Sequence, residues 1–124
     1  IVKKHSCIKV LGEIEHTLMY KLYNQIDVVV SCSREDAMPV VVTEGCMTGK
    51  LIILSDAIGS ADFIEHGKTG LVFKNEDVDG LIRWIEWAVS NREQAERIGR
   101  ASKEVYKKYF SMDQFKDNLL AIIK

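Results

Sequence analysis

The chain has 124 residues, 47% of them hydrophobic and 28% charged, with 17 Lys and Arg against 18 Asp and Glu. This length and apolar fraction suit a globular domain with a real core rather than a disordered segment. A formal net charge of −1 argues against a general binder of nucleic acid or anionic lipid, because both need a surplus of basic residues. No uncharged run approaches the length of a membrane span, and no signal peptide is expected.

The cysteines predict a reducing compartment rather than a disulfide framework or a metal site. Cys7, Cys32 and Cys46 are odd in number and widely spaced, and they contain no Cys-x2-Cys pair. None of the three histidines stands at ligand spacing from them. We therefore expect small buried hydrophobic side chains in a cytoplasmic protein with no metal site.

Short apolar runs alternate with amphipathic stretches in the first half of the chain. Residues 7–11 form an apolar run closed by a glycine, which predicts a strand, and helical spacing over 18–23 predicts a helix. The run at 28–33 opens with three consecutive valines, a pattern typical of a central parallel strand buried on both faces. Similar runs at 51–54 and 71–73 predict two further strands.

Residues 40–48 form the segment in which propensity and context disagree. Three consecutive valines give it a high β-propensity. However, Pro39 suits the first turn of a helix and Gly49 the residue just past a helix end. A strand here would also leave the flanking parallel strands without a crossover helix. We therefore predict a helix.

The remainder of the chain is predicted to be mainly helical. A short helix is expected at 60–65, with Gly67 after its end, and apolar stripes predict helices over 78–89, 95–109 and 112–123. Asp77 and Ser111 precede the first and last of these three helices, where an N-cap is needed. Trp84 and Trp87 flank the first stripe and are predicted to pack there rather than to form a ligand platform.

The order of these elements predicts the fold class. Strand and helix alternate about four times before the final helices, which indicates an α/β, doubly wound, Rossmann-like fold with about four parallel strands. We expect a single domain over residues 1–124.

The segment 33–39 is the candidate binding site. In open α/β sheets, ligands bind beyond the carboxyl ends of the strands, and this loop joins a predicted strand to a predicted helix whose free amides suit a phosphate. Glu35 and Asp36 would repel a bare phosphate, so hydroxyl groups are their more suitable targets. Glu44 is a third acid in an otherwise apolar helix, a costly place unless it is paired or bound. A solvated charged loop without a ligand is the alternative.

Six motifs occur in one order along the chain. They are Gly12-Glu13-Ile14, Leu22-Tyr23, Asp27-Val28-Val29-Val30-Ser31-Cys32-Ser33, Glu44-Gly45-Cys46-Met47-Thr48-Gly49-Lys50, the segment 55–64 with Gly59 and Asp62, and Gly67-Lys68-Thr69-Gly70-Leu71-Val72-Phe73. The last three are similar to Glu-Ala-Met-Ala-x-Gly-Lys, Gly-Gly-x-x-Glu-x-Ile and Gly-x-x-Gly-Leu-Leu-Val. This ordered set resembles the C-terminal, sugar-nucleotide-binding domain of retaining GT-B-fold glycosyltransferases, the group 1 family.

The resemblance implies roles for the acids. The family signature is two glutamates separated by seven residues, of which the second holds the ribose hydroxyls and the first lies beside the transferred sugar. Glu44 matches the second position and Asp36 the first, with Glu35 as the substitute if the loop shifts. The segment that would face the diphosphate consists of Ala37, Met38, Pro39 and Val40.

The resemblance also implies the reaction and its partners. The expected activity is hexosyl transfer from a UDP- or GDP-sugar, bound as substrate, with no cofactor or metal. The Arg and Lys that the family supplies upstream have no counterpart before Gly12. The chain therefore looks like the distal part of the domain and is expected to be inactive alone. The acceptor, a sugar or lipid-linked glycan, would bind an N-terminal domain, and the full-length protein could be membrane-peripheral.

Two other readings of the same fold compete with this one. The first is a non-catalytic interaction or nucleotide-binding module, which could dimerise through an exposed sheet edge. The second is a receiver-like domain, but Glu35 and Asp36 do not have the spacing of its metal-binding acids.

Overall fold

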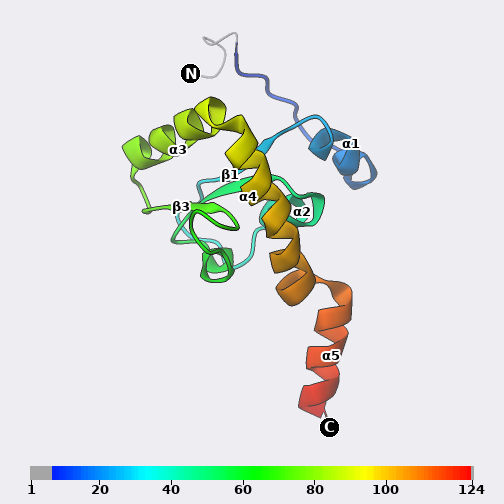
Figure 1. Ribbon diagram of the computed structural model, residues 1–124. Helices are drawn as coiled ribbons and strands as arrows, with labels where there is room; N and C mark the ends of the chain where they lie inside the picture. The colour runs from blue at the N-terminus through cyan, green and yellow to red at the C-terminus, as the bar shows by residue number, and fades with distance from the viewer. Residues whose placement is uncertain (1–6, 124) are drawn as a thin grey trace.

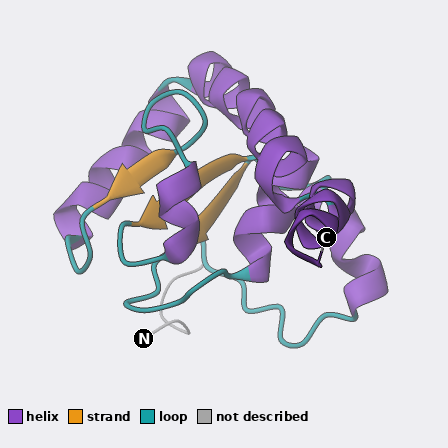
Figure 2. Ribbon diagram, turned by 90° about the horizontal axis from the view of Figure 1, so that it is seen from below, coloured by secondary structure: helices purple, strands orange, loops and turns teal. Residues whose placement is uncertain are grey.

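The computed structural model describes residues 7–123, in which a parallel three-stranded sheet lies between layers of helices (Figure 2). The strands are β1 (Val28–Ser31), β2 (Leu51–Ser55) and β3 (Leu71–Phe73), in the spatial order β1-β2-β3. Val28 of β1 pairs with Leu51, and Ile53 of β2 pairs with Leu71. This arrangement confirms the predicted α/β, Rossmann-like fold class.

Helical segments connect and follow the strands (Figure 1). They are η2 (His16–Leu18), α1 (Met19–Tyr23), α2 (Val40–Thr48), η3 (Gly59–Phe63), α3 (Val78–Ser90), α4 (Arg92–Val105), η4 (Tyr106–Phe110) and α5 (Met112–Ile123). The predicted caps are confirmed: the Asp77 side chain accepts a hydrogen bond from the Gly80 amide at 2.9 Å, and Ser111 Oγ accepts one from the Gln114 amide at 3.2 Å. None of the described helices is both long enough and apolar enough to cross a membrane.

The segment of high β-propensity is a helix, as its context predicts. Gly49 ends α2 in the left-handed conformation, with φ 71°. Pro39 has extended backbone and is the N-cap, one position earlier than the first helical turn that the sequence suggests. Burial of Val42 and Cys46 against the sheet stabilises the helix despite the β-branched residues in its first turn.

The strand β2 is buried on both faces and divides the interior into two cores. Alternate side chains of a strand point to opposite sides of the sheet. Ile52 and Leu54 belong to the α2-side core, which comprises Tyr23, Val29, Val42, Cys46, Ile52, Leu54, Ile58, Ile64 and Val105. Leu51 and Ile53 belong to the α3-side core, which comprises Leu51, Ile53, Leu71, Phe73, Ala88 and Ala95.

The helix α4 contacts both cores. Its first half contributes Ala95 to the α3-side core and packs Ile98 against it, and its last residue, Val105, belongs to the α2-side core. A methyl group on Gly99 would lie 2.7 Å from the Leu51 amide nitrogen, so the helix backbone packs directly against the start of β2. Ser102 Oγ donates to the Gly99 carbonyl at 2.7 Å and lies 3.3 Å from the Lys50 carbonyl oxygen.

Two sequence expectations about the sheet are wrong: a fourth strand at residues 7–11, and a central β1 that is buried on both faces. Residues 7–11 are an exposed segment rather than a fourth strand, because they pair with no other strand in the described part of the chain. The strand β1 lies at an edge of the described sheet instead of its centre. Val30 is therefore 41% exposed, whereas Val29 is buried.

Smaller differences concern cysteines and helix ends. Cys46 is buried as predicted, but Cys7 and Cys32 are exposed because both lie in loops; all three thiols are free. The short helix expected at 60–65 is the 3₁₀ turn η3, and Gly67 adopts φ 80° in the turn before β3 rather than at a helix end. The helix expected over 95–109 changes to π-helical geometry after Val105.

The last helix leaves the body of the molecule. Figure 1 shows α5 extending away from the sheet, and its predicted apolar face, including Phe115 and Leu119, is exposed.

Candidate functional site

The loops after β1 and β2 meet at one edge of the sheet, which we call the carboxyl edge because the strands end there. The Gly59 amide donates to the Asp36 carbonyl at 2.9 Å, and Asp36 forms a parallel bridge with Ile58. A methyl group on Gly59 would lie 2.2 Å from the Ala37 carbonyl oxygen, so only glycine permits this approach. The loop that carries Asp36 is therefore held by the β2 loop.

The loop after β3 joins the same edge. The Asn75 amide donates to Asp56 Oδ1 at 2.7 Å, and Asn75 Oδ1 accepts a hydrogen bond from Ser55 Oγ at 3.4 Å. Asn75 Nδ2 lies 3.5 Å from the Arg34 carbonyl oxygen, and Arg34 Nε lies 3.1 Å from Glu76 Oε1. All three strand ends are thus connected through hydrogen bonds, although the Arg34 ion pair is exposed and contributes little.

Asp36 uses its own side chain to shape the start of α2. Its Oδ1 accepts a hydrogen bond from the Met38 amide at 3.1 Å. Pro39 has no N–H group to donate. Within the segment 37–40, the backbone amides of Ala37 and Val40 are therefore the donors that have no acceptor among the described residues. Two backbone amides of this segment, at the positive end of the α2 dipole, therefore remain as donors that suit an anion.

Glu44 is held between a buried phenol and an exposed imidazole. The Tyr23 hydroxyl donates to Glu44 Oε2 at 2.9 Å, and His16 Nε2 lies 3.4 Å from Oε1. The Glu44 side chain is only 17% exposed, whereas that of His16 is 87% exposed. Burial and the neighbouring carboxylate both raise the pKa of Tyr23, so it stays a hydrogen-bond donor. The expectation that a glutamate here needs a partner is confirmed.

Sequence reasoning identified both acids but not the residues that hold them. Tyr23 is 21 residues from Glu44 and belongs to the Leu22-Tyr23 motif, but no rule of sequence spacing predicts that the two side chains meet. Nothing in the sequence except its position after a predicted strand indicated that Asn75 belongs to this edge. Glu35 is exposed and forms no ion pair with a described residue.

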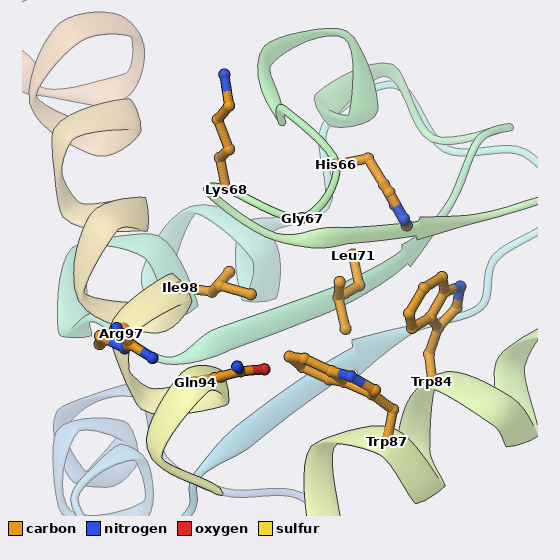
Figure 3. Close-up of a pocket in the computed structure, with 9 residues that line it drawn as sticks. All are labelled: His66, Gly67, Lys68, Leu71, Trp84, Trp87, Gln94, Arg97 and Ile98. Atoms are coloured by element: carbon orange, nitrogen blue, oxygen red, sulfur yellow. The ribbon is translucent and has the colours of Figure 1, made fainter. Parts of the chain in front are cut away.

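Hollows also occur away from this edge. One of about 500 Å³ lies at the opposite, amino end of β3, where Leu71, Trp84, Trp87, Gln94 and Ile98 line it (Figure 3). The two indole rings meet edge to face, with centroids 6.2 Å apart. Both tryptophans pack against the α3-side core, which confirms their predicted packing role.

Over residues 7–123, no group of three or more His, Cys, Asp or Glu side chains is arranged to hold a metal ion.

Comparisons with known proteins give the family. Residues 3–105 match the family model described as "Glycosyl transferases group 1". Sulfoquinovosyl transferase SQD2 of Arabidopsis thaliana is 30% identical over 101 residues, which cover 79% of this chain and 20% of SQD2. Glycogen synthase of Mycobacterium tuberculosis is 24% identical over 105 residues, 82% of this chain and 25% of that protein, so the chain spans a fifth to a quarter of these relatives.

A solved structure shows the same fold. Anabaena Alr3699/HepE, crystallised in complex with UDP, superposes with a TM-score of 0.77 at 17% identity, covering 83% of this chain and 29% of that one. The family match extends over most of the sequence, and the parallel sheet with its helices agrees with it. The chain therefore belongs to the group 1 glycosyl transferases.

Proposed function

We propose that the carboxyl edge of the sheet binds a sugar nucleotide, and that the longer protein transfers its hexosyl group to an acceptor with retention of configuration. Solved complexes of Anabaena HepE with UDP and with UDP-glucose support a nucleotide-sugar donor. The name of SQD2 likewise describes a sugar transferase. The family membership supports the reaction class, and the geometry of the edge supports the residue roles.

The observation that carries the proposal is the half-buried carboxylate of Glu44, on the helix that follows β1. A carboxylate accepts two hydrogen bonds from a vicinal diol, and the ribose of a nucleotide is such a diol. In the proposal Glu44 binds the ribose and Asp36 lies beside the sugar. The carboxylate of Glu35 takes that second role if the loop shifts.

The reaction breaks the bond between the sugar C1 and the diphosphate oxygen and forms a bond from C1 to an acceptor hydroxyl, which loses its proton. Negative charge grows on the leaving diphosphate, so donors aimed at it stabilise the transition state more than the ground state. The Ala37 and Val40 amides, with the α2 dipole, suit this position. The proposal needs no resident metal or cofactor. It assigns further cationic groups and the acceptor site to the rest of the longer protein.

The free thiols fit a reducing compartment, so the proposal includes a cytoplasmic location. A non-catalytic module that pairs with a second copy through β1 is the competing function, because β1 is an edge of the described sheet.

The test is a titration of UDP, GDP and their glucose or mannose esters, followed by backbone amide shifts. We expect shifts confined to residues near Asp36 and Glu44, unchanged by EDTA. Glu44→Gln should weaken binding about tenfold or more, the scale of hydrogen bonds to a charged group. Glu96→Gln on the exposed face of α4 is the matched control. Absence of shifts with every nucleotide, together with a mass that rises with concentration, would support the competing module.

A further inference from the structure

Tyr23 connects the α2-side core to the proposed ribose site. Its side chain is only 4% exposed and belongs to the same core as Val42 and Cys46 of α2, the helix that carries Glu44. The ring is therefore fixed by packing, while its hydroxyl donates to Glu44 Oε2 at 2.9 Å. No other described side chain makes a hydrogen bond of this kind to Glu44.

The two oxygens of Glu44 have different partners. Oε2 faces the buried Tyr23 hydroxyl, and Oε1 faces His16 Nε2 at 3.4 Å. His16 belongs to the short turn η2 and its side chain is 87% exposed, so its 3.4 Å contact with Glu44 is weak and easily replaced. A diol arriving from solvent can replace the imidazole but cannot replace the phenol without opening the core.

We infer that Tyr23 is a positioning residue that orients the Glu44 carboxylate toward the nucleotide ribose; this rests on the proposed function. A free glutamate side chain samples many rotamers, and binding would have to order it. The Tyr23 hydrogen bond orders it before the ligand arrives. Tyr23 itself contacts no substrate, and its effect is confined to the ribose hydroxyls that Glu44 binds.

The experiment compares a nucleotide with its analogue that lacks both hydroxyls. Dissociation constants for UDP and for 2′,3′-dideoxy-UDP are measured on wild type, Tyr23→Phe, Glu44→Gln and the double variant, with GDP and its dideoxy analogue titrated in parallel. Tyr20→Phe is the matched control, because Tyr20 lies on the same helix with 58% of its surface exposed.

Tyr23→Phe should weaken binding of the ribonucleotide five- to tenfold and leave binding of the dideoxy analogue unchanged. Phenylalanine keeps the packing of the ring, so a role in the fold alone would weaken both ligands equally, and that result would overturn the inference. In the double variant the loss should equal that of Glu44→Gln, because the hydroxyl acts only through the carboxylate. Tyr20→Phe should change neither constant.

A second readout uses the wild-type protein and needs no variant to fold. On addition of UDP, the ¹³Cζ signal of Tyr23 should stay in place while the imidazole signals of His16 move. A displaced Tyr23 signal with unchanged His16 signals would contradict the assignment. If Glu44→Gln weakens UDP binding but Tyr23→Phe does not, the inference fails and the proposed function stands. If wild type binds neither nucleotide, both fail.

Discussion

The contact between Gly59 and Ala37 gives the sharpest test of how the carboxyl edge is built. The Gly59 amide donates to the Asp36 carbonyl at 2.9 Å, and an added methyl group would lie 2.2 Å from the Ala37 oxygen. Non-bonded carbon contacts are favourable at about 3.5 Å, so Gly59→Ala must separate the two loops by about 1 Å or more. The obstacle is backbone, which cannot move aside as a flexible side chain can.

The expected loss of stability follows from two terms. Overpacking of this kind costs about 1–3 kcal/mol, and loss of the Gly59 hydrogen bond adds about 1 kcal/mol. We therefore expect Gly59→Ala to lower the free energy of unfolding by about 3 kcal/mol. With a urea slope of about 2 kcal/mol per molar, the midpoint of unfolding should fall by about 1.5 M.

The matched control is Gly67→Ala, which has φ 80° but no heavy atom within 4 Å of the added methyl. Gly67→Ala carries only the backbone cost of a left-handed residue, about 1–2 kcal/mol, whereas Gly59, which has no positive φ, carries only the steric cost. Urea unfolding followed by circular dichroism measures both variants. If Gly59→Ala is no less stable than Gly67→Ala, the close approach of the two loops is wrong.

Three further predictions concern groups outside the site. Burial raises the pKa of the Cys46 thiol to about 11, so below that pH it stays protonated and unreactive. At pH 8 a thiol reagent should modify Cys7 and Cys32 rapidly and Cys46 only after unfolding. Rapid modification of all three thiols in the folded protein would contradict this. Asp77→Ala removes the cap on the Gly80 amide and should cost about 1 kcal/mol in thermal unfolding; an unchanged melting temperature would argue against the cap. Trp87→Ala should cost about 2 kcal/mol, less than the roughly 3–5 kcal/mol of a fully buried tryptophan because this ring is only partly buried against the α3-side core. Nucleotide affinity should not change, since the ring lies at the opposite edge of the sheet; weaker nucleotide binding would refute that separation.

The course of the chain was largely predictable because each signal was local or had a clear topological consequence. The helix over 40–48 is the best example: its valines favour a strand, but a crossover between parallel strands requires a helix. The strand predicted at residues 7–11 is wrong for the opposite reason. Its composition suits a strand, but a strand exists only when another strand pairs with it, and composition says nothing of that partner.

The sequence alone could identify the acidic residues of the candidate site, but not the side chains that surround them. Glu44 attracted attention because a carboxylate in an apolar helix needs a partner. The partner proved to be Tyr23, brought near by packing of α1 and α2 over the sheet, and such contacts have no signature in spacing. Likewise, Gly59 could be noted as a glycine in a motif, but its necessity lies in the Ala37 carbonyl of another loop.

The helix α4 has a consequence for how the molecule unfolds. Because it contributes Ala95 to one core and Val105 to the other, neither side of the sheet can melt while the other keeps its full complement of contacts. The helix backbone at Gly99 also packs directly against the start of β2, between the two cores. The two sides thus form one cooperative unit, and the amide protons of β2 that face β1 and those that face β3 exchange with solvent through the same opening event.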